Sequence, residues 1–300
     1  MQRARRSCLS VPASSERFIA SAASVEADEI FLDLEDSVAP GAKATARSLA
    51  AAALGSDGWG SRTVGVRIND ASSRWAYADL LAVAVPRLDI IVLPKVRSPR
   101  DVIWLDVLLG QVEADRGLPA GRIGIEAQIE DSRGLAAVDA IAACSRRLES
   151  LVFGPADYIA SIGMRTLEVG EQPPGYAADA YHYPLLRILV AARANDLQAI
   201  DGPYLRIRDA EGFRRSALNA AALGYDGKWV LHPGQVPVAN DVFAPTAAEF
   251  ARANQILDAY QRATDDQLRG AVMLGDEMID EASRKMAQAM VARGRAAGLR

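Results

Sequence analysis

Eight short runs rich in β-branched residues alternate with alanine-rich stretches of helical periodicity, and this alternation limits the possible folds more than any other feature. The runs are candidate strands at Ser7–Val11, Glu29–Leu34, Thr63–Asn69, Asp89–Pro94, Gly124–Glu130, Leu148–Gly154, Gln198–Asp201 and Lys228–Leu231. Helical patterns recur between them at Ala42–Leu54, Trp75–Val85, Pro99–Glu113, Gly134–Ser145, Tyr183–Asn195 and Glu211–Leu223. Eight strands that alternate with helices within ~250 residues predict a (β/α)₈ TIM barrel. An open doubly wound sheet is the alternative, but no GxGxxG turn follows an early strand to support it.

The pattern changes after Pro237. A helix with one apolar face is predicted at Ala247–Arg262, a short turn-bounded run at Gly270–Gly275, and a terminal helix from about Asp280. We therefore expect two parts: a barrel catalytic domain over residues 1–240, and a C-terminal helical extension over residues 241–300 that acts as a lid or as an oligomer contact.

The charge balance and the histidine count narrow the function classes. Lys and Arg total 34 and Asp and Glu total 38, and the net charge of −4 argues against a general affinity for nucleic acid or anionic membranes. No apolar run approaches the ~18 residues of a membrane span, and the apolar stretch behind the basic first six residues is too short for secretion. We therefore expect a cytoplasmic protein. With only two histidines, His182 and His232, a metal site in this chain would need carboxylate ligands.

Polar and apolar residues alternate with a period of two in the fifth predicted strand. Its two faces hold Glu126, Gln128 and Glu130 on one side, and Ile125, Ala127 and Ile129 on the other. Because successive side chains of a strand point to opposite faces, we expect the isoleucines beneath the helices and the three polar groups inside the barrel. The third strand predicts the same for Arg67 and Asn69.

Acidic residues also gather where other strands end. The second strand ends in Asp33-Leu-Glu-Asp36, and Asp157 follows the sixth. An inward carboxylate is costly unless a cation or hydrogen-bond donors compensate it, and several acids with one arginine indicate a site for a hard cation such as Mg²⁺. The alternative is that Arg67 pairs with Glu35 or Asp36 and that the other acids are solvated at the barrel rim.

Several motifs, in order along residues 6 to about 235, resemble the citrate lyase β-subunit family. They are Arg6-Ser-Cys-Leu-Ser-Val-Pro12, Ala27-Asp28, Asp33-Leu-Glu-Asp-Ser-Val-Ala-Pro40 with Lys43 and Arg47, Arg67-Ile-Asn69, Leu93-Pro-Lys95, Ile129-Glu130 with Arg133-Gly134, Phe153-Gly154 with Asp157, Gly224-Tyr-Asp-Gly-Lys228 and His232-Pro233. The tail, from Gly270-Ala to Met278-Ile-Asp280, resembles the extended members of the family, the malyl-CoA and citramalyl-CoA lyases. Glu126 and Gln128 depart from the apolar residues expected inside the fifth strand.

This resemblance implies a Mg²⁺-dependent (β/α)₈ carbon–carbon lyase. Its substrate would be a 3-hydroxyacyl-CoA such as malyl-CoA, methylmalyl-CoA or citramalyl-CoA, cleaved into an acyl-CoA and a 2-oxoacid, glyoxylate or pyruvate. By similarity Glu130 and Asp157 hold the metal, which polarises the carbonyl of the 2-oxoacid. Arg67 places a fixed positive charge beside the reacting oxygen. Glu35 and Asp36 hold metal-bound water and orient Arg67.

The resemblance also implies roles for residues outside the metal site. Asp280 would be the base that moves a proton at the acyl-CoA α-carbon, reaching the barrel mouth of a neighbouring subunit, although it would equally make an ordinary helix N-cap. Substrate binding is expected from Arg67 and from Gly154, Pro155, Ala156 and Lys43. A lid that reaches a neighbour requires a homo-oligomer, a trimer or hexamer by family resemblance.

Three other functions remain open on the sequence. The same site could hydrolyse the thioester or favour condensation, since a bound enolate can react in either direction. The chain could be a citrate lyase β-subunit that needs acyl-carrier and transferase partners, which the self-contained tail argues against. A metal-free isomerase of phosphorylated sugars would need a glycine-rich phosphate cradle, and Asp201-Gly-Pro-Tyr204 supplies a single glycine.

Overall fold

Parallel strands close into a barrel. In a computed structural model, which describes residues 3–267 and 270–299, β1 to β8 pair in chain order and β8 pairs back with β1. The strands are β1 (Ser7–Pro12), β2 (Glu29–Asp33), β3 (Thr63–Arg67), β4 (Ile90–Leu93), β5 (Gly124–Ile129), β6 (Leu148–Phe153), β7 (Gln198–Asp201) and β8 (Gly227–Val230). The (β/α)₈ barrel predicted from the alternation is confirmed.

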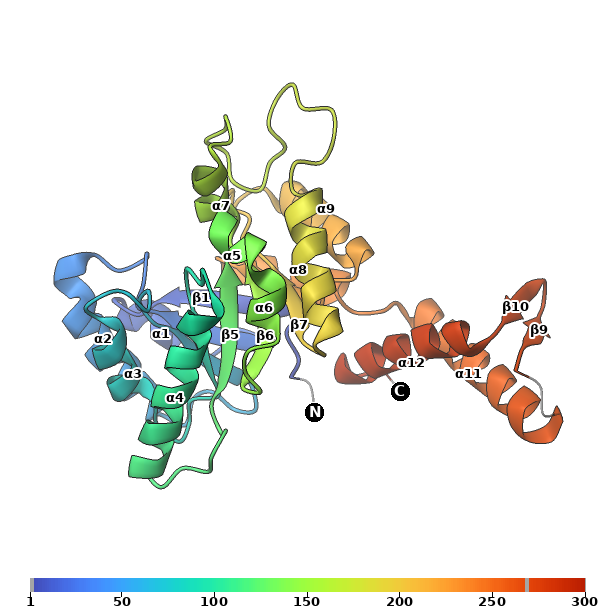
Figure 1. Ribbon diagram of the computed structural model, residues 1–300, viewed down its shortest axis with the longest axis horizontal. Helices are drawn as coiled ribbons and strands as arrows, with labels where there is room; N and C mark the ends of the chain where they lie inside the picture. The colour runs from blue at the N-terminus through green and yellow to red at the C-terminus, as the bar shows by residue number, and fades with distance from the viewer. Residues whose placement is uncertain (1–2, 268–269, 300) are drawn as a thin grey trace. The chain divides into compact units, whose positions relative to one another are not determined.

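Helices follow the strands and surround the barrel (Figure 1). They are α1 (Glu16–Ala22), α2 (Lys43–Leu54), α3 (Ala76–Val83), α4 (Pro99–Asp115), α5 (Ser132–Ala136), α6 (Val138–Ala142), α7 (Pro155–Ile162), α8 (His182–Ala194), α9 (Ala210–Leu223) and α10 (Val236–Val242), with 3₁₀ turns at Pro40–Ala42 and Pro233–Gln235. Across the described parts of the chain, no helix is both long and apolar enough to cross a membrane.

The predicted helices differ from the observed ones at four places. Helices α1, α7 and α10 are only about two turns long, and the sequence pattern did not predict them. The long connection between β6 and α8 therefore begins with α7, whose C-cap Gly163 is left-handed at φ 68°. The predicted helix Gly134–Ser145 divides at Ala137 into α5 and α6.

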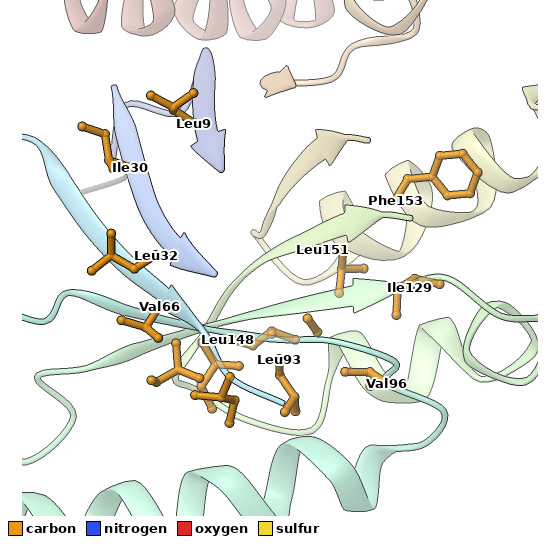
Figure 2. Close-up of a cluster of buried hydrophobic side chains, with 14 of the residues drawn as sticks. Leu9, Ile30, Leu32, Val66, Leu93, Val96, Ile129, Leu148, Leu151 and Phe153 are labelled. Atoms are coloured by element: carbon orange, nitrogen blue, oxygen red, sulfur yellow. The ribbon is translucent and has the colours of Figure 1, made fainter. Parts of the chain in front are cut away.

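Apolar side chains form two layers, one inside the barrel and one between the strands and the surrounding helices. The inner cluster contains Cys8, Phe31, Ile90, Val92, Val152, Ile200 and Trp229. The outer cluster packs the other faces of the strands against the helices, and Figure 2 shows its members Leu9, Ile30, Leu32, Val66, Leu93, Val96, Ile129, Leu148, Leu151 and Phe153. Ile125, Ala127 and Ile129 belong to this outer cluster, as the alternation in the fifth strand predicts.

Residues 244–300 form a compact unit of their own, separate from residues 1–243. It contains α11 (Ala247–Gln267), an antiparallel hairpin of β9 (Val272–Leu274) and β10 (Glu277–Ile279), and α12 (Glu281–Ala296). Phe250, Ala253, Ala287 and Val291 join α11 to α12 through a small apolar core. The short run predicted at Gly270–Gly275 is the first half of the hairpin.

A buried charged cluster lies at the N-terminal end of the barrel. Its members, called the floor cluster below, are Arg5, Glu29, Glu126, Glu149 and Gln198. The guanidinium of Arg5 donates to Glu29 at 3.0 Å, to Glu149 at 2.8 Å, and also to Glu126 and Gln198. Glu126 thus points into the barrel as predicted, but its partner is Arg5 at the barrel floor, at the end opposite to the strand ends where the catalytic residues are expected.

The floor cluster makes stability depend on pH. The pKa of Glu29 is raised well above its ordinary value, first because burial removes its carboxylate from water and then because Glu126 adds a like charge, which Arg5 offsets in part. The folded protein therefore keeps a proton that the unfolded chain releases. Since the unfolded state then binds fewer protons, the free energy of unfolding falls as the pH rises above the ordinary pKa of glutamate.

We expect Glu126→Gln to reduce this dependence. In the wild type, the free energy of unfolding should fall as the pH rises above the ordinary pKa of glutamate, by at most about 1.4 kcal/mol per pH unit for one proton. The variant removes the like charge beside Glu29, so its slope should be shallower. Guanidinium unfolding at a series of pH values measures both slopes, and equal slopes would contradict this interpretation of the cluster.

Candidate active site

Arg67, at the end of β3, is fixed by a fully buried acid. Its Nε and Nη2 donate to the two carboxylate oxygens of Asp33 at 2.7 Å each, and Asp33 also accepts the backbone N–H groups of Glu35 and Ser37. Burial acts to lower the pKa of Arg67, but the attraction and hydrogen bonds of Asp33 outweigh it and the pKa rises. Two of the three guanidinium nitrogens are thereby used, and Nη1 faces Glu35 at 3.4 Å.

Arg67 has one expected partner and one that was not expected. The sequence offered Glu35 or Asp36, and Arg67 does pair with Glu35 at 3.4 Å, but its shorter, two-pronged pair is with Asp33. Asp33 faces into the barrel because Phe31 and Glu29, two and four residues earlier on β2, also face inward. Asn69, expected inside the barrel beside Arg67, instead bonds Asp79 of α3 at 2.6 Å, because β3 ends at Arg67 and the alternation ends with it.

Lys95, which follows β4, contacts Glu130 through its backbone and contacts Glu35 and Asp36 through its side chain. Its backbone is left-handed at φ 51°, a conformation that is costly for a residue with a side chain. In this conformation its N–H donates to Glu130 Oε1 at 2.6 Å, while Nζ bonds Glu35 and lies 3.2 Å from Asp36. Burial acts to lower the pKa of Lys95, but its bond to Glu35 raises the pKa overall, so the ammonium stays charged.

Glu130 and Asp157 differ from the other acids at this end of the barrel. Within residues 3–267 and 270–299 neither of them forms an ion pair, whereas Asp33, Glu35 and Asp36 are each paired with Arg67 or Lys95. The pKa of Glu130 is raised well above its ordinary value, first by burial and then by the negative charge of Asp157, against the attraction of Arg67. Two carboxylates thus repel each other with no cation of the protein between them.

The end of β6 approaches Glu130 closely. A Cβ on Gly154 would lie 2.3 Å from the Cβ of Glu130 and 3.0 Å from Gln128 Nε2, so only glycine fits there. Pro155 then starts α7, and its first turn carries Ala156 and Asp157. The absence of a side chain at Gly154 lets α7 begin beside Glu130, which brings Asp157 to the same pocket.

Glu130 and Asp157 both line an open pocket of about 540 Å³. It is lined by Lys95, Arg97, Glu130, Asp131, Ser132, Arg133, Asp157, Ala160 and Ser161. No cluster of three or more Asp, Glu, His or Cys residues suited to a metal occurs in the described part of the chain. Two unpaired carboxylates on an open pocket nevertheless fit Mg²⁺, which takes one or two carboxylates and keeps its other positions for water and substrate oxygens.

Gln128 links the arginine to the unpaired acids. Its Nε2 donates to Glu130 Oε2 at 2.6 Å, and its Oε1 accepts from Arg67 Nη1 at 3.5 Å. The sequence placed Gln128 inside the barrel, but its role became apparent only from these two contacts. The amide holds Glu130 in one orientation and keeps Arg67 from pairing with it.

We expect Gln128→Met to weaken divalent-metal binding by about 10- to 100-fold, because a ligand that has lost its supporting hydrogen bond is no longer oriented. Titration of the purified protein with Mn²⁺, following free Mn²⁺ by electron paramagnetic resonance, measures this directly. Gln261→Met, on the exposed surface of α11, is the matched control and should bind as the wild type does. An unchanged affinity in Gln128→Met would contradict the role of the amide.

Two basic residues of the family motifs, Lys43 and Arg47, are used in other ways. Lys43, expected to bind substrate, is buried, and its Nζ donates to the backbone carbonyls of Leu34 at 2.8 Å and Glu35 at 2.7 Å. These bonds hold the turn after β2, which carries Glu35, so substrate binding by Lys43 stays a prediction that its contacts do not support. Arg47 likewise bonds Asp79 at 2.8 Å.

Asp280 is the N-cap of α12, as the sequence allowed. Its Oδ1 accepts the Ser283 N–H at 3.0 Å and the Ser283 hydroxyl at 3.2 Å. The backbone N–H of Ser283, followed by its hydroxyl, lowers the pKa of Asp280, which keeps the carboxylate ionised. Asp280 lies in the unit of residues 244–300, and its role as a base stays a prediction.

Comparisons with known proteins cover nearly the whole chain. A family model described as HpcH/HpaI aldolase/citrate lyase matches residues 6–233. An L-malyl-CoA/beta-methylmalyl-CoA lyase of Rhodobacter capsulatus is 38% identical over 292 residues, covering 93% of this chain and 90% of that protein. A citrate lyase subunit beta of Haemophilus influenzae is 33% identical over 276 residues, covering 92% of each. The crystal structure of CitE from Mycobacterium tuberculosis in complex with magnesium, acetoacetate and coenzyme A is similar with a TM-score of 0.74 and 30% identity, covering 96% of this chain and 97% of that one.

Proposed function

Because this chain belongs to the HpcH/HpaI aldolase/citrate lyase family, we propose that it is a Mg²⁺-dependent carbon–carbon lyase of CoA thioesters. Its substrate is a 3-hydroxyacyl-CoA such as malyl-CoA, β-methylmalyl-CoA or citramalyl-CoA, and its products are an acyl-CoA and a 2-oxoacid. The similarity to the Rhodobacter capsulatus lyase over 93% of the chain supports this substrate class.

The observation that carries the proposal is the unpaired state of Glu130 and Asp157 beside a fixed arginine. Acids that serve stability are paired, as Asp33 is with Arg67. Glu130 and Asp157 face one pocket and repel each other, and neither forms an ion pair with a cation of the described residues. This arrangement is costly for folding and suits a divalent cation.

The two acids of the pocket and the nearby Arg67 have separate tasks in this proposal. When bound between Glu130 and Asp157, Mg²⁺ supplies positive charge that polarises the oxygens of the 2-oxoacid. Arg67 is held by Asp33 through Nε and Nη2, and its Nη1, which faces Glu35 and Gln128, is the group that would stabilise negative charge on the substrate oxygen. Because Asp33 fixes the guanidinium before substrate arrives, no reorganisation is needed as that charge develops.

The proton transfers that the reaction requires suggest the remaining roles. Cleavage breaks the carbon–carbon bond next to the hydroxyl, the hydroxyl loses its proton, and the acyl-CoA enolate takes up a proton at its α-carbon. Asp280 is the residue that moves this second proton in the proposal, as the resemblance to the family implies. Glu35 and Asp36, both bonded to Lys95, hold water next to Glu130 and keep Lys95 from pairing with it. Gly154, Pro155 and Ala156 shape the wall on which the substrate lies.

A panel of free CoA thioesters tests the proposal. The purified chain is incubated with malyl-CoA, β-methylmalyl-CoA or citramalyl-CoA, with Mg²⁺ or with EDTA, and released glyoxylate or pyruvate is measured. We expect 2-oxoacid from at least one thioester with Mg²⁺ and none with EDTA. Release of free CoA without 2-oxoacid would instead indicate a thioesterase.

A second candidate function follows from the relative in Haemophilus influenzae, a citrate lyase subunit beta. In that case the chain would be inactive on all free CoA thioesters and would act only with acyl-carrier and transferase partners. Inactivity across the panel, with Mg²⁺ bound, would contradict the lyase proposal and favour this subunit.

Assembly and location complete the proposal. A CoA thioester is a substrate found inside cells, which supports a cytoplasmic enzyme. A homo-oligomer, a trimer or hexamer by resemblance to the family, would allow Asp280 to serve a neighbouring subunit.

A further inference from the structure

The guanidinium of Arg67 lies over the indole ring of Trp229 inside the barrel. Its central carbon, Cζ, is 5.3 Å from the centre of the ring. Trp229 is on β8 and points inward, since the next residue, Val230, belongs to the outer cluster. Trp229 is 2% exposed, and Phe31 packs against it with 4.5 Å between the ring centres. Arg67 therefore has an aromatic contact in addition to its ion pair with Asp33.

The hydrogen bonds of Arg67 leave one movement of its guanidinium free. Because Nε and Nη2 both donate to Asp33, the carboxylate lies near the plane of the guanidinium. This pair resists sliding within the plane, but it allows the plane to tilt about the two bonds. Nη1 lies on the side of Cζ away from Asp33, so a tilt moves Nη1 more than the other two nitrogens. The contacts of Nη1 with Glu35 at 3.4 Å and Gln128 at 3.5 Å are long and resist the tilt only weakly.

Strand β3 itself does not restrict this tilt. The inward position before Arg67 on β3 is Gly65, because Val64 and Val66 both belong to the outer cluster. Gly65 has no side chain that could lie against the guanidinium. The ring of Trp229, which reaches Arg67 from β8, provides a surface that limits the tilt, because a cation over the face of an aromatic ring is attracted to it.

Tryptophan at position 229 has a cost that phenylalanine would avoid. The Nε1–H of Trp229 is buried and has no hydrogen-bond acceptor among the described residues. A buried tryptophan N–H normally has a partner, and one without a partner destabilises the fold. The ring of phenylalanine, however, attracts a cation less strongly than an indole does. Tryptophan at this position therefore favours the contact with Arg67 over the stability of the core.

We propose that Trp229 is a positioning residue whose ring keeps Nη1 of Arg67 aligned with the substrate oxygen. Asp33 fixes the guanidinium within its plane, and Trp229 fixes the tilt of that plane. Trp229 acts through Arg67 and does not contact the substrate. This inference rests on the proposed function, since the oxygen that Nη1 serves belongs to the CoA thioester or to its 2-oxoacid product.

Steady-state kinetics of CoA-thioester cleavage test this role. Trp229→Met keeps an apolar side chain but removes the ring, and we expect kcat to fall by about 10- to 30-fold. KM should change by less than about twofold, because the contact stabilises the transition state rather than the bound substrate. Trp229→Phe keeps a weaker ring and should lose about two- to threefold in kcat. Ile200→Ala, in the same inner cluster, is the control: it should lower the melting temperature but keep the wild-type kcat.

A double variant separates an effect through Arg67 from a general effect on the core. Arg67→Met/Trp229→Met should be no slower than Arg67→Met alone, because Trp229 then has no guanidinium to position. The proposal would be overturned by an unchanged kcat in Trp229→Phe, by a kcat in Trp229→Met that falls no further than in Ile200→Ala, or by a double variant well below Arg67→Met.

Crystal structures of the wild type and of Trp229→Met provide a measurement that does not need activity. In the variant, Arg67 should keep its two bonds to Asp33, while Nη1 tilts away from its wild-type position. An unmoved guanidinium would overturn the proposal. A wild type that cleaves none of the CoA thioesters would contradict the proposed function, and the two crystal structures would still show whether Trp229 holds Arg67 in place.

Discussion

Glu130→Gln is expected to lower kcat/KM for CoA-thioester cleavage by about 10³-fold, since a metal that polarises a carbonyl contributes several kcal/mol of transition-state stabilisation. The substitution keeps the shape of the side chain and the bond from the Lys95 N–H, while it removes the charge that a divalent cation requires. Asp157→Asn should have an effect of the same size. Steady-state rates with Mg²⁺ in excess measure both.

Two further variants make this prediction specific. The double variant Glu130→Gln/Asp157→Asn should be little worse than either single one, because two ligands of one ion act as a unit. Asp139→Asn removes an exposed acid that pairs with Arg187 on the barrel surface, and it should leave the rate unchanged. Near wild-type activity of Glu130→Gln would show that the charge of Glu130 is not needed for the reaction.

Arg5→Met is expected to cost about 3–5 kcal/mol in the free energy of unfolding, because it leaves buried acids without their cation. The side chain of Arg5 is 1% exposed, and it is the common partner of Glu29, Glu126, Glu149 and Gln198. Methionine fills much of the same space as arginine. The lost stability therefore measures the removal of the positive charge rather than the creation of a cavity. Equilibrium unfolding in guanidinium chloride measures it.

The matched control is Arg3→Met. Arg3 pairs with Glu149 at 3.1 Å, but its side chain is 29% exposed, so its loss should cost less than about 1 kcal/mol. Arg5→Met combined with Glu126→Met should recover a large part of the stability, because replacing a buried pair with apolar groups is far less costly than breaking it. Similar losses from Arg3→Met and Arg5→Met would show that the floor cluster is not the source of the effect.

The fold could be predicted because its signal is repeated along the chain. Each strand is a short apolar run and most helices span several turns, so the order of elements follows from periodicity alone. Strand β5 shows how far this extends: its alternation correctly placed Ile129 in the outer layer and Glu126, Gln128 and Glu130 inside. The missed helices α1, α7 and α10 are only about two turns long, which gives no period to detect.

Side-chain partners across the barrel could not be predicted, because they depend on the register between strands distant in sequence. The basic residues at the start of the chain resembled the beginning of a signal peptide, yet Arg5 crosses the barrel floor to Glu126, 121 residues away. Arg67 was placed inside correctly, but its pairing with Asp33 follows from the direct alignment of these two residues on neighbouring strands.

The candidate site was predicted in part. The sequence and its resemblance to the family selected Glu130, Asp157 and Arg67, and the pocket brings the two acids together. The sequence placed Gln128 inside the barrel and named Asp33 and Lys95, but it did not show the contacts through which these three residues keep the acids unpaired. The left-handed backbone of Lys95 has no signature in a non-glycine residue, and only the folded chain shows that its N–H reaches Glu130.

The central claim is that Glu130 and Asp157 together bind one divalent cation, and diffraction from crystals soaked with Mn²⁺ in place of Mg²⁺ tests it most directly. The anomalous difference map should contain a peak within bonding distance of one carboxylate oxygen of Glu130 and one of Asp157. A peak that contacts neither acid, or no peak while the same crystals bind a 2-oxoacid, would contradict it.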